Sequence, residues 1–420
     1  MAQAVPACLD VHLGADTPAV HDAPALSPAA LPDDIRLAVH ENLNEVERDW
    51  RAFEAQADGT VFQCFDWLAT WQRHIGARNG VRPAIVVGRD DAGAILFLLP
   101  LSVRAVGIAR ELAWLGSELC DYNMPLLAPA FAERFGGKGF LPLWAGIKQR
   151  LQRHPRLHFD FVSLTKMPEM VGGQADPMLD LGVTINPSGA YLTHLAGDWE
   201  TFYAAKRSSS TRRRDRTKRK KLSEFGEVRL VNPVGDAETL HSLDTLMVQK
   251  ARSFARMGVG NLFAKPGHAE FYRALATDPA SKHLVHVSRL DVGETPAAIN
   301  LALTFRDRYY HLLASYDDGE ASRFGPGAAH LHDLLQMAIE RGFKIFDFTI
   351  GDERYKRDWC DTELKLYDHI QAATWRGVLV AAPILALRPL KRWIKQTPAV
   401  WSAFSAGRMF VGSLARRLRG

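Results

Sequence analysis

The sequence predicts a mixed α/β fold built from two units of similar design. The chain has 420 residues, of which 47% are hydrophobic and 24% charged, so it is long enough for two or three domains. Apolar residues repeat at helical spacing in some segments and alternate at strand spacing in others. In each half, helices precede a meander of strands, and a further helix and strand follow. This shared order indicates a duplicated fold, although the residue-level similarity between the halves is weak.

The first unit is expected over residues 35–185, after a disordered leader at residues 1–34 that is rich in Ala, Pro and Asp. Val46, Trp50 and Phe53 repeat at i, i+4 and i+7, which predicts a helix. The expected elements are a strand at 36–40, helices at 46–53 and 65–75, strands at 84–88, 94–103 and 111–115, a helix at 143–151 and a strand at 157–164. Asp90-Asp91-Ala92-Gly93 predicts a tight turn between the second and third strands.

The second unit is expected over residues 186–376. Its predicted helices lie at 199–205, 211–225, 237–252 and 270–276, and its predicted strands at 284–290, 297–305 and 309–316. A helix at 328–341 follows Gly325-Pro326-Gly327 and stops at Gly342, and a strand at 344–350 comes next.

Composition excludes several classes of protein. It does not fit a disordered chain or a disulfide-stapled mini-domain. The cysteines (Cys8, Cys64, Cys120 and Cys360) lie far apart, and the histidines lack metal-ligand spacing, so we expect no metal site and no disulfide framework. The first basic residue is Arg36, and the longest uncharged apolar run, 377–387, is shorter than the roughly 20 residues that span a bilayer. A cytoplasmic protein is therefore expected.

Charge is strongly segregated along the chain. Residues 206–221 contain ten basic side chains and one acid, a net of +9, and residues 376–420 contain nine basic side chains and no acid. Since the whole chain carries +5, the remaining residues carry −13 by difference. Two basic patches on an acidic body favour anionic partners such as phosphates, anionic lipid or RNA.

Several strings resemble one known family. In the first half they are Phe62-Gln63 with Trp67 and Trp71, Leu99-Pro100-Leu101, Leu115-Gly116 and Asp121-Tyr122-Asn123-Met124-Pro125-Leu126-Leu127. In the second half they are Ser315-Tyr316-Asp317, Gly325-Pro326-Gly327 and the run from Phe346 to Trp359. Over roughly residues 35–376 the chain resembles the CelD-type acetyltransferases of cellulose biosynthesis, which are FemAB-like members of the GNAT acyltransferase superfamily.

The resemblance implies two tandem GNAT-like domains. It also implies an enzyme that transfers an acyl group, usually acetyl, from acyl-CoA to an amine or hydroxyl. The implied acceptor is a small molecule or a precursor related to surface polysaccharide.

The loop before the 328–341 helix is the expected site for the cofactor. Arg323, Gly325, Gly327 and Ala328 lie at this helix start, whose positive dipole end favours an anion. The resemblance implies that GNAT enzymes hold the CoA pyrophosphate here, on a motif that begins with Arg or Gln three residues before the first glycine. That position is Ser322 in this chain, and Pro326 supplies no N–H. A plain helix-start turn is the alternative interpretation.

The end of the 344–350 strand is the expected catalytic cluster. Acyl transfer needs a base for the attacking group, an acid for the leaving thiolate and donors for the oxyanion. Asp347 or Glu353 is the expected base, and Tyr316 or Tyr355 the expected acid.

Substrate binding is expected from Lys356, Asp352, Asn300 and Arg213. The structural alternatives are a helix cap at Asp352, a dipole contact at Glu353, core packing at Tyr355 and a satisfied buried amide at Asn300.

The basic run at 206–221 is expected to meet an anion, because an ordinary exposed helix interleaves acids among its bases. The partner is a phosphorylated substrate, RNA or a membrane, and a solvated helix face is the alternative. The run contains no aromatic residue, which argues against stacking on single-stranded nucleic acid, and we expect no DNA partner.

Residues 377–420 form an expected basic amphipathic tail, divided into short helices by Pro383, Pro389 and Pro398. The tail is expected either to lie on the anionic inner face of the membrane or to pack on the protein.

Two rival functions stay open. One is aminoacyl-tRNA-dependent transfer, in which the basic run receives tRNA. The other is a non-catalytic accessory module of exopolysaccharide or cellulose synthesis.

Overall fold

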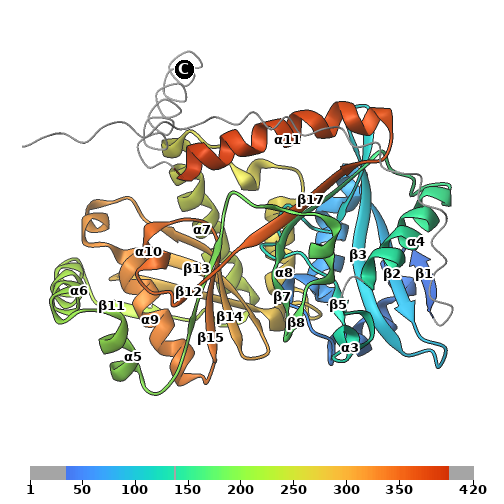
Figure 1. Ribbon diagram of the computed structural model, residues 1–420. Helices are drawn as coiled ribbons and strands as arrows, with labels where there is room; N and C mark the ends of the chain where they lie inside the picture. The colour runs from blue at the N-terminus through green and yellow to red at the C-terminus, as the bar shows by residue number, and fades with distance from the viewer. Residues whose placement is uncertain (1–34, 137–138, 397–420) are drawn as a thin grey trace, which may run out of the picture.

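The computed structural model describes residues 35–136 and 139–396, with residues 389–396 described as backbone (Figure 1). The leader expected at 1–34 and the tail beyond Gln396 lie outside the described residues. The described chain forms two large mixed β-sheets, which lie side by side with helices packed around them (Figure 1).

The first sheet is built mainly by the first half of the chain. Its strand order is β1 (Arg36–His40), β2 (Arg82–Arg89), β3 (Ile95–Val106), β4 (Ala109–Trp114), β6 (Phe161–Pro168), β17 (Leu366–Ala372) and β9 (Thr184–Ile185), and β5 (Leu126–Leu127) pairs with β3. Its helices are α1 (Glu47–Glu54), α2 (Phe65–Trp71), α3 (Phe131–Phe135) and α4 (Phe140–Arg153). β7 (Met170–Val171) and β8 (Gln174–Ala175) form a separate hairpin. β1 to β4 form an antiparallel meander, and β6 returns parallel to β4 after α4.

The second sheet repeats this order. Its strands are β11 (Val228–Val231), β12 (Val285–Val292), β13 (Thr295–Phe305), β14 (Arg308–Tyr316), β15 (Ile345–Ile350), β10 (Ala190–His194) and β16 (Thr362–Leu364). Its helices are α5 (Trp199–Lys206), α6 (Ser209–Leu222), α7 (Gly235–Met257), α8 (His268–Thr277), α9 (Pro326–Glu340) and α10 (Arg354–Arg357). β11 to β14 form the meander, and β15 returns parallel to β14 after α9. The predicted duplicated mixed α/β fold is therefore confirmed.

α9 shows how local sequence produces an element of this fold. Gly325 adopts a left-handed conformation (φ 71°) and Pro326 begins the helix, where its missing N–H costs nothing. Leu331, Leu334 and Leu335 then face the core. The helix is thus held over the second sheet with its first turn at the edge where β14 ends.

The expected boundary at residue 376 does not follow the sheets. Residues 366–372 fall within the expected second unit, but they form β17, which lies in the first sheet, antiparallel to β6. The chain thus leaves the first sheet after β9, builds the second sheet and returns. A long-range pairing of this kind has no signature in local sequence, because β17 carries the same alternation in either sheet.

The predicted division of the tail by prolines is also wrong within the described residues. One helix, α11 (Trp375–Gln396), runs through Pro383 and Pro389. Its inner face is made of Gly377 and Ala381, which let it lie close to the first sheet. A Cβ atom at Gly377 would come within 1.8 Å of Asp160 O. The close packing of α11 on the first sheet compensates for the roughly 3 kcal/mol by which an interior proline destabilises a helix.

The main hydrophobic core extends across both halves. It contains Trp50 and Trp67 from the first half together with Leu246, Phe271 and Leu301 from the second. Phe271 of α8 packs edge-to-face on Trp67 of α2, with ring centroids 5.1 Å apart. The two units therefore share buried apolar surface. No helix among the described residues is both long and apolar enough to cross a lipid bilayer.

Candidate active site

The neighbouring strands β14 and β15 separate after a short paired stretch. They pair only from Arg308–Ile345 to Tyr310–Asp347, after which β14 continues beside β13 and β15 beside β10. Leu312 is an extra residue in β14, because Leu313 faces Leu301 and His311 faces Ala302. Bulges of this kind release backbone groups from the ladder and are common beside active sites. The sheet therefore opens toward the carboxyl ends of its two parallel strands.

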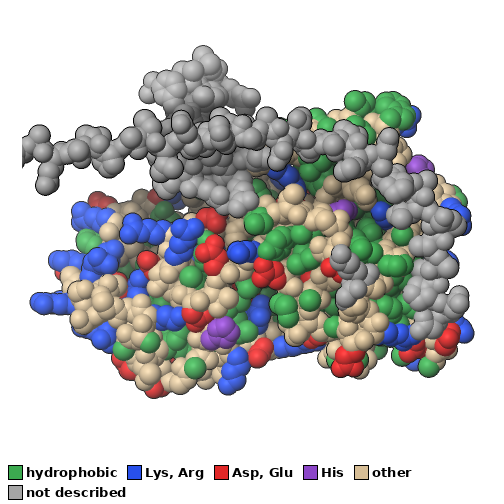
Figure 2. Space-filling view, viewed as in Figure 1, with side chains coloured by type: hydrophobic (Ala, Val, Ile, Leu, Met, Phe, Trp, Pro, Cys, Tyr) green, Lys and Arg blue, Asp and Glu red, His purple; other side chains and the backbone are tan. Residues whose placement is uncertain are grey.

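The start of α9 lies beside the basic helix α6. A cavity of about 110 Å³ separates them and is lined by Gly325, Ala328, Arg216, Lys218 and Arg219, among others. We call it the α6–α9 cavity. The Lys218 ammonium lies 4.0 Å from the position of a Cβ atom on Gly325. Arg219 is held there by Asp333 of α9, at 2.8 Å. Figure 2 shows Lys and Arg side chains gathered at the end of the molecule where Figure 1 places α6.

The first turn of α9 offers few free amides. The N–H of Gly325 donates to Ser322 O, and those of Ala328 and Ala329 donate to Gly325 O. Pro326 has no N–H, so the Gly327 N–H is the one amide of this turn that finds no acceptor among the described residues. An anion placed here would therefore depend mainly on the cationic side chains of α6.

Four residues of the predicted cluster lie where β14 and β15 separate. Lys356 Nζ donates to Ile350 O (2.7 Å) and pairs with Glu353 (3.0 Å), so it ties α10 to the end of β15. The Glu353 carboxylate is 57% exposed and faces solvent at the opening. Tyr355 packs between His311 and Phe348 with part of its ring exposed. Tyr316 is exposed beside Gly327.

Asp347 lies deeper than the sequence implied. It is fully buried, and one carboxylate oxygen accepts hydrogen bonds from Tyr122 Oη (2.7 Å) and Thr349 N (2.8 Å). The other oxygen pairs with Arg308 at 3.2 Å. Burial raises the pKa of Asp347, and the Arg308 charge and these two hydrogen bonds oppose the shift. With both oxygens engaged, the carboxylate positions its neighbours.

The two family strings meet at this point. Asp121 and Tyr122 of the first half contact Thr349 and Asp347 of the second. Thr349 has a left-handed backbone (φ 61°), which is strained for a β-branched residue and costs roughly 1–2 kcal/mol. Hydrogen bonds from both halves thus hold the strained end of β15 in place.

Asn300 lies behind the opening. Its side chain is fully buried, and in the orientation that satisfies both ends of the amide its nitrogen donates to His311 Nε2 at 2.9 Å. Burial lowers the pKa of His311 to about 3, so the ring is neutral and can accept this bond. Asn300 therefore supports His311 from the core.

Two predicted ligand residues lie away from the α6–α9 cavity. Arg213 is exposed on another face of α6, and Arg323 is exposed with its guanidinium over the Phe324 ring (4.9 Å). Neither lines the cavity, whereas Gly325 and Ala328 do. Asp352 lies next to the β15 end and accepts a long hydrogen bond from Tyr191 (3.3 Å).

Sequence reasoning missed several residues of the site. Lys250 on α7 and His311 on β14 were not predicted at all. Lys218 and Arg216 were included only within the basic run at 206–221, and Tyr122 only within a family string. The buried Leu222 was a usable signal, because Lys218 and Arg219 lie four and three residues before it and so share its helix face. Burial lowers the pKa of Lys250, with the nearby Lys356 adding to this shift and Glu353 opposing it.

In the described part of the chain, no three His, Cys, Asp or Glu side chains gather as metal ligands.

Comparison with known proteins finds similarity in the second unit and in the overall fold. Residues 209–357, from the start of α6 to the end of α10, match the family described as "Acetyltransferase (GNAT) domain". The fold is similar to the crystal structure of FemX, with a TM-score of 0.52 at 10% identity, covering 79% of this chain and 96% of that one. It is also similar to a conserved protein of unknown function from Bacteroides thetaiotaomicron, with a TM-score of 0.50 at 11% identity, covering 79% and 99%. No curated protein matches the chain by sequence.

At such low identity these structural likenesses show the fold alone, which is the tandem arrangement of two mixed α/β units. The sequence match adds a similarity of residues 209–357 to the GNAT acetyltransferase family. The ends of β14 and β15, α6, α9 and α10 lie within this matched segment.

Proposed function

We propose that the protein transfers an acyl group, acetyl in the simplest case, from acyl-CoA to an amine or hydroxyl of an acceptor. The observation that carries this proposal is the separation of β14 and β15 beside the first turn of α9, inside the segment that matches the GNAT domain. The proposal places the thioester of the donor between these two strand ends. A cationic cavity lies at its outer end.

The α6–α9 cavity fits the pyrophosphate of the donor. Gly325 and Ala328 bring the positive end of the α9 dipole to its wall, and Arg216 and Lys218 supply charge from α6. In this proposal α6 replaces amide donors that the turn lacks at Pro326. The pantetheine arm would follow β14 toward the bulge at Leu312.

The chemistry follows from the groups at the opening. The acceptor nitrogen or oxygen attacks the thioester carbon, the C–S bond breaks, and the proton lost by the acceptor ends on the departing thiolate. Glu353, whose carboxylate is exposed next to Lys356, is the proposed base. Tyr316 or Tyr355 is the proposed acid, since both present exposed phenol groups there. Asp347 is a positioning residue.

The donor proposal is tested by thermal unfolding with CoA, acetyl-CoA and longer acyl-CoAs. A ligand at 100 times its dissociation constant stabilises the folded state by about 2.7 kcal/mol. We expect Lys218→Ala to weaken CoA binding roughly tenfold, because it removes a charge-assisted contact. Lys220→Ala is the matched control, since Lys220 is exposed on α6 and does not line the cavity. Equal affinities of the two variants would contradict the assignment, as would no shift with any CoA species.

Catalysis is tested with Glu353→Gln, which keeps the shape of the side chain and removes the base. Turnover should fall while CoA binding stays. Unchanged turnover would leave Glu353 without a catalytic role. The accessory-module alternative would be favoured if cells carrying this variant or Lys356→Ala still produced exopolysaccharide or cellulose normally.

The acceptor class rests on resemblance. The CelD-like strings favour an acceptor related to surface polysaccharide, such as an amino-sugar precursor. A panel of amino sugars and sugar phosphates, assayed for release of free thiol from acetyl-CoA, tests this class directly.

One observation favours a second candidate, aminoacyl-tRNA as donor. α6 exposes Arg213, Arg214 and Lys220 on the faces that do not meet α9, a surface suited to a nucleic-acid backbone. Such binding would weaken steeply with salt and disappear after RNase treatment.

The outer face of α11 is a proposed contact with anionic membrane, because Trp375, Val378 and Leu379 are exposed there and a basic segment follows α11 in the sequence. Flotation with anionic vesicles tests that contact.

A further inference from the structure

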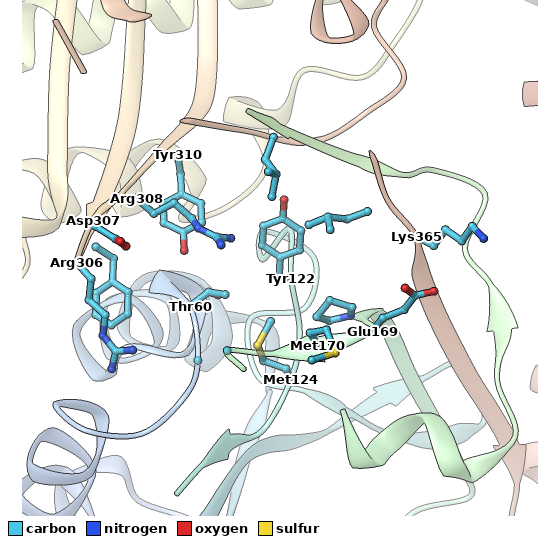
Figure 3. A pocket seen from close by; sticks show the side chains of 16 residues that line it. Thr60, Tyr122, Met124, Glu169, Met170, Arg306, Asp307, Arg308, Tyr310 and Lys365 are labelled. Carbon is cyan, nitrogen blue, oxygen red and sulfur yellow. The ribbon is translucent and has the colours of Figure 1, made fainter. Parts of the chain in front are cut away.

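A second cavity lies at the opposite ends of β14 and β15, where the two halves of the protein meet. It measures about 300 Å³. The first half contributes Tyr122, Met124 and Met170, and the second half contributes Arg308 and Tyr310 (Figure 3). We call it the junction cavity. Arg308 begins β14 and Tyr316 ends it, so about 26 Å of strand separates this cavity from the first turn of α9.

The junction cavity explains a sequence string that the donor site does not use. Along Asp121-Tyr122-Asn123-Met124, the odd and even positions face opposite directions. Asp121 contacts Thr349 and Asn123 donates to Thr165 O, while Tyr122 and Met124 line the cavity. The string therefore forms one wall of a cavity whose other wall is the start of β14.

Two arginines give this cavity a cationic side. Arg308 uses one guanidinium nitrogen on Asp347, and its side chain remains 26% exposed toward the cavity, with the guanidinium 5.7 Å from the centre of the Tyr310 ring. Arg306 is fixed by donating through Nη2 to Glu54 O and Ala57 O, which leaves its other nitrogens unused by these bonds. A planar guanidinium with spare donors is suited to a carboxylate or a phosphate.

The acidic residues that line the cavity do not neutralise the positive charge of these arginines. Glu169 accepts a hydrogen bond from Tyr367 (2.5 Å), and Asp307 lies on the exposed β13–β14 turn. The rest of the lining includes apolar atoms of Met124, Met170, Leu192 and Leu364. Figure 3 shows Tyr122, Arg308 and Tyr310 grouped on one side of the cavity, with Met124, Met170 and Glu169 across from them.

We infer that the junction cavity binds a small organic anion. Arg308 binds the carboxylate or phosphate of this anion, and Met124 and Met170 contact the rest of the molecule. A volume of about 300 Å³ suits a molecule of the size of a sugar phosphate or a short carboxylic acid. As a site of the acceptor, this inference rests on the proposed acyl transfer. As an anion site, it is independent of the donor.

Asp347 connects the two sites. One oxygen of its carboxylate accepts hydrogen bonds from the cavity residue Tyr122 and from the Thr349 N–H at the end of β15, and the other oxygen pairs with the cavity residue Arg308. An anion that draws Arg308 toward itself would act on the same carboxylate that holds the strained end of β15. Acceptor binding is thereby coupled to the geometry of the opening.

The test is calorimetric titration of the full chain with three probes: inorganic phosphate, acetate and glucosamine 6-phosphate. The wild type should bind at least one probe with saturation, and Arg308→Gln should weaken it at least tenfold, since a charge-assisted contact is lost. The phosphate and acetate arms separate the two kinds of anionic group. Arg229→Gln is the matched control, because Arg229 is exposed on β11 and does not line the cavity.

Two further variants keep the inference falsifiable. Met170→Trp places a larger side chain in the junction cavity at a partly exposed position and leaves Asp347 unchanged. It should weaken binding of the same probe, and it provides the test if Arg308→Gln misfolds. Lys218→Ala reports on the α6–α9 cavity. Binding that is lost in Lys218→Ala and kept in Arg308→Gln would overturn the inference, and so would a wild type that binds none of the probes. A protein that binds the probe but shows no shift with any CoA retains the anion site and loses the proposed donor.

Discussion

Asp347 shows how much the role of one carboxylate depends on its neighbours. Its place in the sequence, late in a strand and followed by Gly351, Asp352 and Glu353, fits a catalytic base. In the fold it is enclosed by Tyr122, Thr349 and Arg308, and both of its oxygens are in use. A buried carboxylate that loses one of its partners is costly, because the desolvated charge is left less compensated.

Removal of the hydroxyl in Tyr122→Phe should destabilise the protein by about 1–3 kcal/mol, since Asp347 stays buried with one hydrogen bond fewer. Urea unfolding measures this change. Tyr367→Phe is the control: it also removes a hydrogen bond to a carboxylate, but Glu169 is exposed and can be hydrated, so about 0.5 kcal/mol or less is expected. Similar losses in the two variants would contradict the buried role of the Tyr122 contact.

His330 provides a test by pH. Burial lowers its pKa to about 3, and its Nε2 lies 3.0 Å from Ser288 Oγ. Below the unfolded pKa of about 6.5, the unfolded chain binds a proton that the folded chain refuses, so the wild type loses stability as pH falls toward 3. Other buried groups titrate as well, and burial raises the pKa of Glu54 to about 7, which acts in the opposite direction.

The comparison with His330→Gln isolates the single group. The stability deficit of this variant is the amount by which its free energy of unfolding falls below that of the wild type. It should decrease by roughly 2 kcal/mol between pH 6.5 and pH 5, because only the wild type has a His330 that binds a proton on unfolding. Between pH 7.5 and 8.5 the deficit should stay constant. A deficit that remains the same at pH 5 would mean that His330 is protonated in the folded protein.

Among the elements, α6 and α11 show what a basic helix does once it is packed. In α6, Leu222 is buried and Arg219 pairs with Asp333 of α9. Part of the basic run therefore packs against α9, although its sequence is typical of a solvent-exposed helix face. α11 lies on the first sheet through its two small residues, Gly377 and Ala381. The contact of each helix depends on one narrow strip of side chains.

A methyl group at Gly377 should therefore detach α11. In Gly377→Ala the new Cβ would overlap Asp160 O, and a backbone carbonyl cannot rotate away as a side chain could. We expect faster proteolytic cleavage within residues 373–388, measured by mass spectrometry of the fragments. Ala382→Gly, at an exposed position of the same helix, is the control for helix propensity. Equal cleavage of the two variants would show that α11 is held by other contacts.

The whole molecule behaves as one folding unit in this architecture. The main core runs across both halves, and β17 returns to the first sheet after the second is complete. The first sheet cannot be completed without β17, which follows the whole second sheet in the chain. The walls of the junction cavity, which come from different halves, are consequently held together by the shared core.

Unfolding should be a single cooperative transition, because the two units share buried apolar surface. Calorimetry should give equal van't Hoff and calorimetric enthalpies, and circular dichroism and tryptophan fluorescence should report coincident midpoints. Two separated transitions would show that the halves fold independently.

Local sequence was sufficient for most of the fold. The helices and strands of both meanders follow from spacing, turn residues and caps, as at Gly325 and Pro326, since these signals act over a few neighbouring residues. The strings around Tyr122 and Asp347 also pointed to functional regions. For the same reason the local signals could not place β17, whose alternation suits either sheet.

Only the tertiary structure decided which of the flagged residues work together. Asp121 and Thr349 are more than 200 positions apart in the chain, yet they are in contact, and Arg308 becomes a cavity residue because Asp347 and Tyr122 face it. Likewise, Lys218 rather than Arg213 borders the start of α9, because the rotation of α6 is set by the burial of Leu222. The sequence by itself determined the elements and their chemistry. Long-range packing decided their partners, because the free energy of burial depends on surfaces that come together only in the folded chain.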